Sequence, residues 1–232
     1  MLRKWDDLPD FMRIDEVQPY WEVLNNKRGQ LSIKRAFDVA MATVLLIILA
    51  VPMIVIAVMI KMGSNGPVFY RQKRVTSYGK IFRIHKFRTM VADADKKGAS
   101  VTVENDNRIT KIGSKIRKLR LDELPQLIDV LNGDMSFVGT RPEVVKYVRR
   151  YKPEYLATLL LPAGITSEAS IKYRDEDRLL SNASNVDEVY VRQVLPEKMR
   201  WNLGAINRFG LMGELLTIIK TATVVGLQKV DG

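Results

Sequence analysis

Cysteine is absent from this chain of 232 residues, and histidine occurs once, at His85. Without cysteine there is no thiolate nucleophile, disulfide or thiolate zinc site. A single histidine excludes multi-histidine metal sites, and a Ser-His-Asp triad would have to use His85, which lies in an alternating, strand-like run. Any bound metal must therefore be held by oxygen atoms, which points to magnesium or a similar hard cation.

Acidic residues are too few to balance the basic ones. The chain has 26 Asp and Glu against 37 Lys and Arg, a formal net charge of +11. A protein this basic is expected to meet a polyanion, which leaves nucleic acid, anionic lipid and a nucleotide-type substrate as classes of partner. Its length is enough for one good hydrophobic core.

Long apolar runs are scarce, and the longest extends from Val39 to Ile60, interrupted by little except Thr43 and Pro52. As a helix of roughly 22 residues rising about 1.5 Å each, it just matches a hydrocarbon core of about 30 Å. Basic residues flank it on both sides, so a straight span would violate the preference for basic cytoplasmic flanks at one end. Pro52 favours a helix that enters, breaks and returns to the same face. A single kinked span remains the alternative.

Two alternating segments, 68–75 and 80–88, flank the turn-forming sequence Ser77-Tyr78-Gly79 and predict a β-hairpin. Basic and aromatic residues interleave in both segments. Such a face suits stacking with nucleic acid, or contact with anionic headgroups or a diphosphate. Beside a membrane segment we favour the headgroup or the diphosphate.

The stretch Leu119–Leu127 places two adjacent carboxylates, Asp122 and Glu123, directly after a strongly basic segment. Apolar residues with helical spacing follow, Pro125 suits a first turn and Gly133 a helix end. We therefore expect a helix that begins at Asp122 as its N-cap, where free N–H groups favour an anion. The alternative is a capped surface helix whose two acidic side chains are solvated and have no functional role.

Beyond Gly133, Gly139 and Pro142 bracket Arg141 in a compact turn suited to presenting an arginine to an oxyanion. Helices are expected from Pro142 and from Pro153, the latter with an aromatic-aliphatic face for either a core or an interface. The apolar run after Leu211 is too short and too interrupted to span a membrane. We favour an interfacial amphipathic helix there over ordinary core or oligomer contact.

Several motifs occur in one order, and together they resemble the bacterial sugar transferase family, the monotopic phosphoglycosyl transferases. The motifs are Lys34-Arg35-x-x-Asp38, Gly66-Pro67-Val68-Phe69-Tyr70-Arg71-Gln72, Lys86-Phe87-Arg88-Thr89-Met90, Leu121-Asp122-Glu123-Leu124-Pro125-Gln126 and Val138-Gly139-Thr140-Arg141-Pro142-Glu143. The resemblance runs from about residue 32 to the C-terminus and is to the minimal form of the family. Residues 162–176 depart from the commonest pattern, which leaves the sugar and nucleotide open.

The resemblance implies transfer of a sugar 1-phosphate from a nucleotide diphosphate sugar, such as a UDP-sugar, to polyprenol phosphate (undecaprenyl phosphate). This is the first membrane step of glycoconjugate assembly, in capsule, exopolysaccharide, O-antigen or glycoprotein synthesis. It also implies Mg²⁺ and an Asp-Glu dyad, here Asp122 and Glu123. Asp122 is suited to attack the β-phosphorus as a covalent nucleophile, while Glu123 either binds the magnesium ion or assists proton removal.

The remaining predicted site residues fall into three groups. Phosphate clamps and substrate-binding residues are Arg88, Arg117, Arg141, Pro142 and Glu143. Asp122 and Glu123 are the predicted metal ligands. The membrane segment is entered at Lys34, Arg35 and Asp38 and broken at Pro52.

The expected architecture is α+β and mostly helical, with a re-entrant helix-break-helix in the membrane and a small catalytic domain. The divisions are an N-terminal extension (1–31), the re-entrant helix (32–62) and a cytoplasmic catalytic domain with a β-hairpin and C-terminal amphipathic helices (63–232). This places the protein at the cytoplasmic face of a bacterial inner membrane, on an anionic lipid bilayer and without nucleic acid. A homo-oligomer remains open, and the rival function is a membrane-anchored nucleic-acid-binding module or scaffold without catalysis.

Overall fold

A computed structural model describes residues 1–91, 94, 106–174 and 185–227, and within these the chain is mostly helical with three small two-stranded sheets. The α-helices are α1 (Gln18–Asn25), α2 (Arg28–Gly63), α3 (Lys111–Lys118), α4 (Gln126–Asn132), α5 (Val145–Val148), α6 (Glu168–Lys172), α8 (Val186–Val189), α9 (Leu195–Asn207) and α10 (Leu211–Leu227). Short 3-10 helices are η1 (Trp5–Asp7), η2 (Asp10–Met12), η3 (Ser77–Gly79), η5 (Leu121–Glu123) and η6 (Pro153–Leu159), and η7 (Tyr190–Val194) is a π-helix. The predicted α+β, mostly helical class is confirmed.

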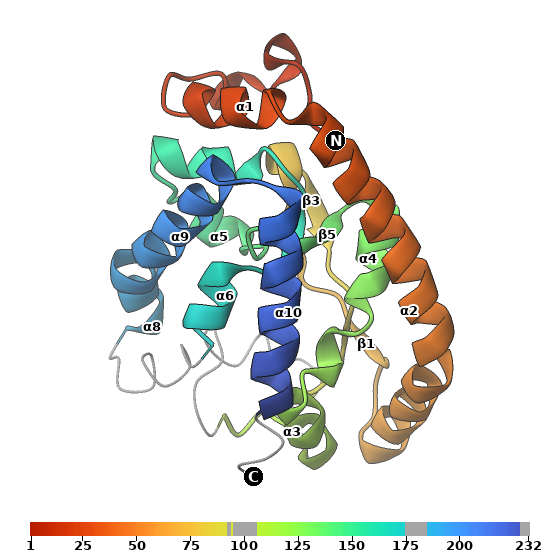
Figure 1. Cartoon of the computed structure of the whole chain (residues 1–232). Coiled ribbons are helices and arrows are strands. Elements are labelled where there is room, and N and C mark those ends of the chain that lie inside the picture. The colour runs from red at the N-terminus through yellow and green to blue at the C-terminus, as the bar shows by residue number, and fades with distance from the viewer. Residues whose placement is uncertain (92–93, 95–105, 175–184, 228–232) are drawn as a thin grey trace.

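Helix α2 is the longest element, at 36 residues, and it begins well before the apolar run. Pro52 lies inside it and does not interrupt the helix assignment. A proline removes one backbone hydrogen bond and its ring presses on the preceding turn, so it bends a helix whose other bonds persist. Figure 1 shows α2 along one side of the molecule, with its axis bent in the lower part. Residue 52 thus lies within a continuous bent helix rather than in a gap between two helices.

One face of α2 packs on the rest of the protein along most of its length. Ala42 lies in a buried cluster with Leu127 of α4 and Met135. Ile56 and Ile60 lie in a second buried cluster, with Phe87 and Ile116. The opposite face is apolar and exposed, with Ile47, Ile48, Val51, Ile54, Val55, Val58 and Met62. Among the described residues, α2 is the one helix long and apolar enough to cross a membrane.

The predicted β-hairpin is present as two short antiparallel ladders. Strand β2 (Lys73–Val75) pairs with β3 (Ile81–Arg83), and β1 (Phe69–Tyr70) pairs with β4 (Lys86–Phe87). Tyr78 and Gly79 both have positive φ in the turn η3, at 59° and 74°. The left-handed conformation explains why a glycine is found there.

A parallel pair, β5 (Met135–Val138) and β6 (Ala163–Thr166), forms the other sheet. The chain between them passes through α5 and η6, and the predicted helix from Pro153 is the 3-10 helix η6. Just past β5 the backbones come so close that a Cβ on Gly164 would lie 2.2 Å from the amide nitrogen of Gly139. These two positions therefore admit no side chain without a shift of the backbone.

The largest core cluster joins the N-terminal residues to the C-terminal half. Leu8, Met12 and Leu24 are buried together with Met199 and Leu203 of α9. The first thirty-one residues thus pack into the main core. The predicted aromatic-aliphatic face of η6 lies in the same cluster, because Tyr155, Leu159 and Leu160 are all buried there.

The two C-terminal helices differ in how they pack. Helix α9 buries Met199, Leu203 and Ile206 and belongs to the core. Helix α10 lies beside β5, β6 and α6 (Figure 1) and leaves apolar side chains exposed, namely Met212, Leu215, Leu216 and Ile219. An amphipathic role at an interface is thus open to α10 and not to α9.

Candidate active site

The predicted dyad, Asp122 and Glu123, lies in the 3-10 turn η5 rather than at the first turn of an α-helix. Helix α4 begins three residues later, with Pro125 at its N-cap position, so the expectation that Asp122 caps this helix is wrong. The amides of Leu127 and Ile128 in the first turn of α4 donate to the carbonyls of Leu124 and Pro125, at 3.2 and 3.0 Å, so the preceding turn takes the place of a capping side chain. The Asp122 carboxylate is therefore not used in capping. The predicted end of the helix is confirmed, because Gly133 is left-handed with φ 81°.

A strained residue precedes the dyad. Arg120 has φ 55° and ψ 20°, the left-handed conformation, directly before η5. This conformation costs a residue with a side chain roughly 1–2 kcal/mol. It reverses the chain between the end of α3 and η5, and so sets the direction in which Asp122 leaves the backbone.

Glu123 is bound by two cations from other parts of the chain. Lys86 of β4 donates to Oε1 at 2.8 Å, and Arg141 donates to Oε2 at 3.3 Å and also contacts Oε1. Arg141 follows β5 and donates as well to the carbonyl of Ile165 in β6, at 3.4 Å. The hairpin, η5 and the parallel sheet thus converge on one carboxylate.

The two carboxyl groups of the dyad have pKa values shifted in opposite directions. Burial raises the pKa of Asp122, Lys86 opposes this, and the charge of Glu123 adds to the rise. Burial would also raise the pKa of Glu123, but the charges and hydrogen bonds of Arg141 and Lys86 outweigh it and hold this pKa well below its usual value. In the described part of the chain, no hydrogen bond involves the Asp122 side chain. Paired carboxyl groups in such different environments are typical of a division of chemical roles.

Sequence reasoning assigned no role to Lys86, although its motif was recognised. Its ammonium is largely buried, which lowers its pKa, while the charge of Glu123 acts in the opposite direction. The available signal was a lysine within the alternating run that is otherwise aromatic and apolar on its buried side. From the same motif, Arg88 was chosen as the phosphate clamp.

Arg88 contacts the end of α2 instead of the dyad. Its guanidinium donates to the carbonyls of Ser64 and Asn65 at 2.7 and 3.0 Å, and to the Ser64 hydroxyl at 2.9 Å. Gly66 makes room for it, since a Cβ there would lie 2.2 Å from the Arg88 Nη1. These contacts fasten α2 to the hairpin.

Arg117 and Arg141, the other predicted clamps, do lie at the site. Arg117 is in the last turn of α3, and its charge opposes the rise in the pKa of Asp122. The positive side of the dyad is therefore formed by three side chains, Lys86, Arg117 and Arg141.

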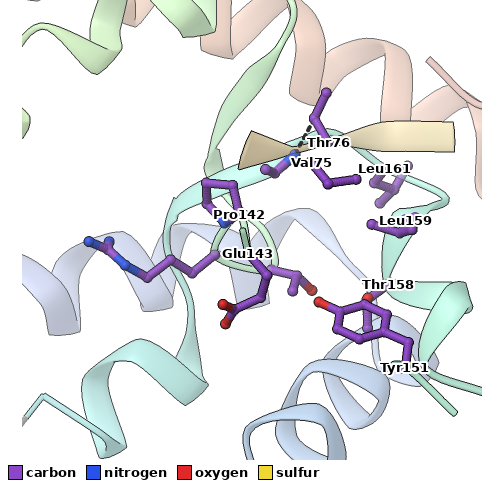
Figure 2. A pocket seen from close by; sticks show the side chains of 11 residues that line it. Val75, Thr76, Pro142, Glu143, Tyr151, Thr158, Leu159 and Leu161 are labelled. Atoms are coloured by element: carbon purple, nitrogen blue, oxygen red, sulfur yellow. Dashed lines mark hydrogen bonds between the residues drawn. The ribbon is translucent and has the colours of Figure 1, made fainter. Parts of the chain in front are cut away.

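Pro142 and Glu143 contact residues other than the dyad. The carbonyl of Pro142 accepts a hydrogen bond from Arg74 at 3.0 Å, and the Glu143 carboxylate accepts one from the Tyr190 hydroxyl. Figure 2 shows Glu143 and Tyr151 reaching into one small cavity, which has room for about one water molecule at ≈10 Å³. Their contacts anchor the segment that carries Arg141.

The motif at the predicted membrane entry forms buried anchors. Lys34 donates to the carbonyl of Val138 at 3.0 Å and pairs with Glu214 of α10. Arg35 donates to the carbonyls of Val130 and Leu131, at 2.6 and 2.9 Å, in the last turn of α4.

Asp38 completes the same set of anchors. Its carboxylate accepts hydrogen bonds from the Ser136 hydroxyl at 2.7 Å and from the Phe137 amide at 3.3 Å. Lys34 and Asp38 are only 3% and 1% exposed, so these residues hold α2 on α4, β5 and α10.

Among the residues that the structure describes, a metal at this site would have the two carboxylates of Asp122 and Glu123 as ligands. In the described ranges, no group of three or more His, Cys, Asp or Glu side chains is placed to hold an ion. Mg²⁺ commonly takes one or two carboxylates and completes its shell with water and substrate phosphate oxygens. Asp122 and Glu123 fit that mode of binding, although Glu123 must first release its two cations.

Comparison with known proteins assigns the family. The bacterial sugar transferase family matches residues 29–228, so the chain belongs to this family, and the resemblance drawn from the motifs is confirmed. An Aeromonas hydrophila protein named UDP-N-acetylgalactosamine-undecaprenyl-phosphate N-acetylgalactosaminephosphotransferase is 33% identical over 196 residues, covering 83% of this chain and 43% of the relative.

Two further relatives have related names. The UDP-glucose:undecaprenyl-phosphate glucose-1-phosphate transferase of Escherichia coli (strain K12) is 36% identical over 168 residues, covering 69% of this chain and 36% of the relative. The exopolysaccharide production protein PSS of Rhizobium leguminosarum bv. phaseoli is 38% identical over 149 residues, covering 61% and 74%. The chain matches less than half the length of the Aeromonas and Escherichia proteins.

Replacing Arg120 tests the strained turn. Arg120→Gly should raise the free energy of unfolding by about 1 kcal/mol, because glycine adopts the left-handed conformation without steric cost. Lys115→Gly, on the exposed face of α3, should lower it by about 1 kcal/mol as a matched control. Thermal unfolding of the purified variants measures both. Equal destabilisation by the two glycines would contradict the strain at Arg120.

Proposed function

We propose that this protein is a phosphoglycosyl transferase that moves a sugar 1-phosphate from a nucleotide diphosphate sugar to polyprenol phosphate. The observation that carries the proposal is the dyad, in which a buried and a largely buried carboxyl group with opposite pKa shifts lie beside Lys86, Arg117 and Arg141. Membership of the bacterial sugar transferase family supports it. The relatives' names support a UDP-sugar as the donor and undecaprenyl phosphate as the acceptor.

The first step is attack by Asp122 on the β-phosphorus of the donor. A carboxylate oxygen bonds to that phosphorus while the bond to the bridging oxygen breaks, and the nucleoside monophosphate leaves with the bridging oxygen. Asp122 is suited to this role because its carboxylate is buried and makes no hydrogen bond in the described part of the chain, whereas Glu123 is held by two cations.

In the second step a phosphate oxygen of polyprenol phosphate attacks the phosphorus of the aspartyl-phosphosugar. The new diphosphate bond forms as the bond to Asp122 breaks, and the carboxylate is restored. Lys86, Arg117 and Arg141 stabilise the negative charge that gathers on the phosphoryl oxygens in both steps. Glu123 either binds the cation or takes the proton of the acceptor.

Magnesium is proposed as the cofactor, with Asp122 and Glu123 as its protein ligands. A bound Mg²⁺ would neutralise phosphate charge. Excess chelator is therefore expected to abolish turnover of a nucleotide sugar, and restored turnover on adding Mg²⁺ would complete the test. Full activity in excess chelator would exclude this role for the dyad.

We further propose that α2 is re-entrant and that residues 63–232 form a catalytic domain on the cytoplasmic face. Two observations support this arrangement. The inner face of α2 packs on the body on both sides of Pro52, through Ala42 and then Ile56, which leaves no length free to cross a bilayer alone. The exposed face of α10 would lie on the headgroups of the same leaflet.

The absence of native cysteine gives a clean test of this topology. Ser32→Cys and Met62→Cys each place one thiol near an end of α2, at exposed positions. For a re-entrant helix, a membrane-impermeant thiol reagent should label neither variant in intact cells and both after permeabilisation. The parent chain is the unlabelled control. Labelling of one of the two in intact cells would support a single span, and Pro52→Leu should shift the result in that direction.

The covalent step is tested without the acceptor. Incubation with a nucleotide sugar alone should release up to one equivalent of nucleoside monophosphate and add the mass of a sugar phosphate to the peptide containing Asp122. Asp122→Asn keeps the shape but removes the attacking charge, so adduct and turnover should both fall by several orders of magnitude. If release requires both substrates and no adduct forms, the carboxylates act only as metal ligands in a direct displacement.

A further inference from the structure

The cations at the dyad come from rigid parts of the fold, whereas their anion comes from a short turn. Lys86 follows His85, whose backbone amide and ring nitrogen Nδ1 contact the Asp129 carboxylate of α4 at 2.8 and 2.6 Å. Arg141 precedes Pro142, whose carbonyl is held by Arg74. Glu123 lies at the end of η5, a turn of three residues. The backbone next to Lys86 and Arg141 is therefore held by contacts that do not involve Glu123.

Glu123 binds these cations as an oxyanion of a phosphate would. Its Oε1 contacts both Lys86 and Arg141, and its Oε2 takes a second donor of the same guanidinium. A forked guanidinium contact beside an ammonium is a common way of binding a phosphate group. The side chains are only 12% exposed for Glu123 and 19% for Lys86, so the two positive charges share a place from which most water is excluded.

We propose that Lys86 and Arg141 form the binding site for the diphosphate group of the donor, and that the Glu123 carboxylate fills this site until the donor displaces it. The inference rests on the proposed function, which supplies the diphosphate. No bond is made or broken in the exchange: diphosphate oxygens replace carboxylate oxygens on the two cations, and Glu123 turns away as a free carboxylate.

Once displaced from Lys86 and Arg141, the Glu123 carboxylate can bind a metal ion. A buried carboxylate that has lost both cations is unstable until it meets another cation or a proton. A divalent ion carried by the diphosphate supplies that charge at the same place. Donor and metal should therefore bind cooperatively, since each favours the displaced position of Glu123 and such coupling is reciprocal.

Binding of inorganic pyrophosphate, measured by calorimetry on the full chain in detergent with excess chelator, tests the exchange without turnover. Glu123→Gln removes the competing charge and should bind pyrophosphate at least about tenfold more tightly than the unchanged protein. Adding Lys86→Met or Arg141→Met to that variant should remove the gain. Glu123→Asp, whose shorter side chain cannot span both cations, should also bind more tightly and serves if Glu123→Gln fails to fold.

Asp122→Asn is the matched control, because it removes the same negative charge one residue away without breaking the ion pairs. If it tightens pyrophosphate binding as much as Glu123→Gln, the gain is a general charge effect and the inference is overturned. Turnover is measured on the unchanged protein, because Glu123 itself belongs to the proposed catalytic machinery. If the unchanged protein turns over a nucleotide sugar but neither Glu123 variant binds pyrophosphate more tightly, the inference is overturned and the proposed function stands. If the Glu123 variants bind pyrophosphate more tightly but the unchanged protein turns over no nucleotide sugar, the proposed function is rejected and the diphosphate site stands.

Discussion

The docking of α2 on the body of the protein is the contact on which the other elements depend. It is made by polar side chains at the start of the helix and by apolar ones further along. Lys34, Arg35 and Asp38 bond to the end of α4, the helix that follows the dyad, and to β5, the strand that precedes Arg141. Buried charges of this kind are costly unless fully paired, so they define one position for the helix rather than a range of positions. The helix that would enter the membrane and the turn that carries Asp122 are thereby held in a single rigid relation.

That relation determines the depth of the site. Ile56 and Ile60 share a cluster with Phe87 and Ile116, and Leu121 and Leu124 pack against it on either side of the dyad. The C-terminal half of α2 and the residues on both sides of the dyad therefore pack against the same hydrophobic cluster. In the proposed function, the large positive charge of the chain would serve two purposes, attraction to an anionic surface and stabilisation of phosphate at the site.

Sequence reasoning worked where a signal is local and failed where partners are distant. The hairpin followed from the alternation around Ser77-Tyr78-Gly79, and the end of α4 from Gly133, because turn chemistry acts within a few residues. The prediction that Asp122 caps α4 was wrong because the turn before α4 satisfies the first amides of the helix with its own carbonyls.

The choice of Arg88 over Lys86 could not be made from the pattern. In an extended strand, Lys86 and Arg88 would lie on the same face. Strand β4 ends at Phe87, however, and the Arg88 side chain contacts Ser64 instead. The burial of Glu143 depends on Tyr190, which lies 47 residues further along the chain. Spacing within a motif carries no information about such a partner.

The anchors of α2 also constrain the order in which the protein can be made. Lys34 meets the carbonyl of Val138, 104 residues later, and Glu214, 180 residues later. At about 5–20 residues per second, a ribosome needs roughly 10–40 s to pass from Lys34 to Glu214. Throughout that interval the apolar helix exists without the body that covers its inner face. In the proposed membrane arrangement, α2 would enter the bilayer before its partners in the body have been made, and the rest of the protein would fold onto a helix that already lies in lipid.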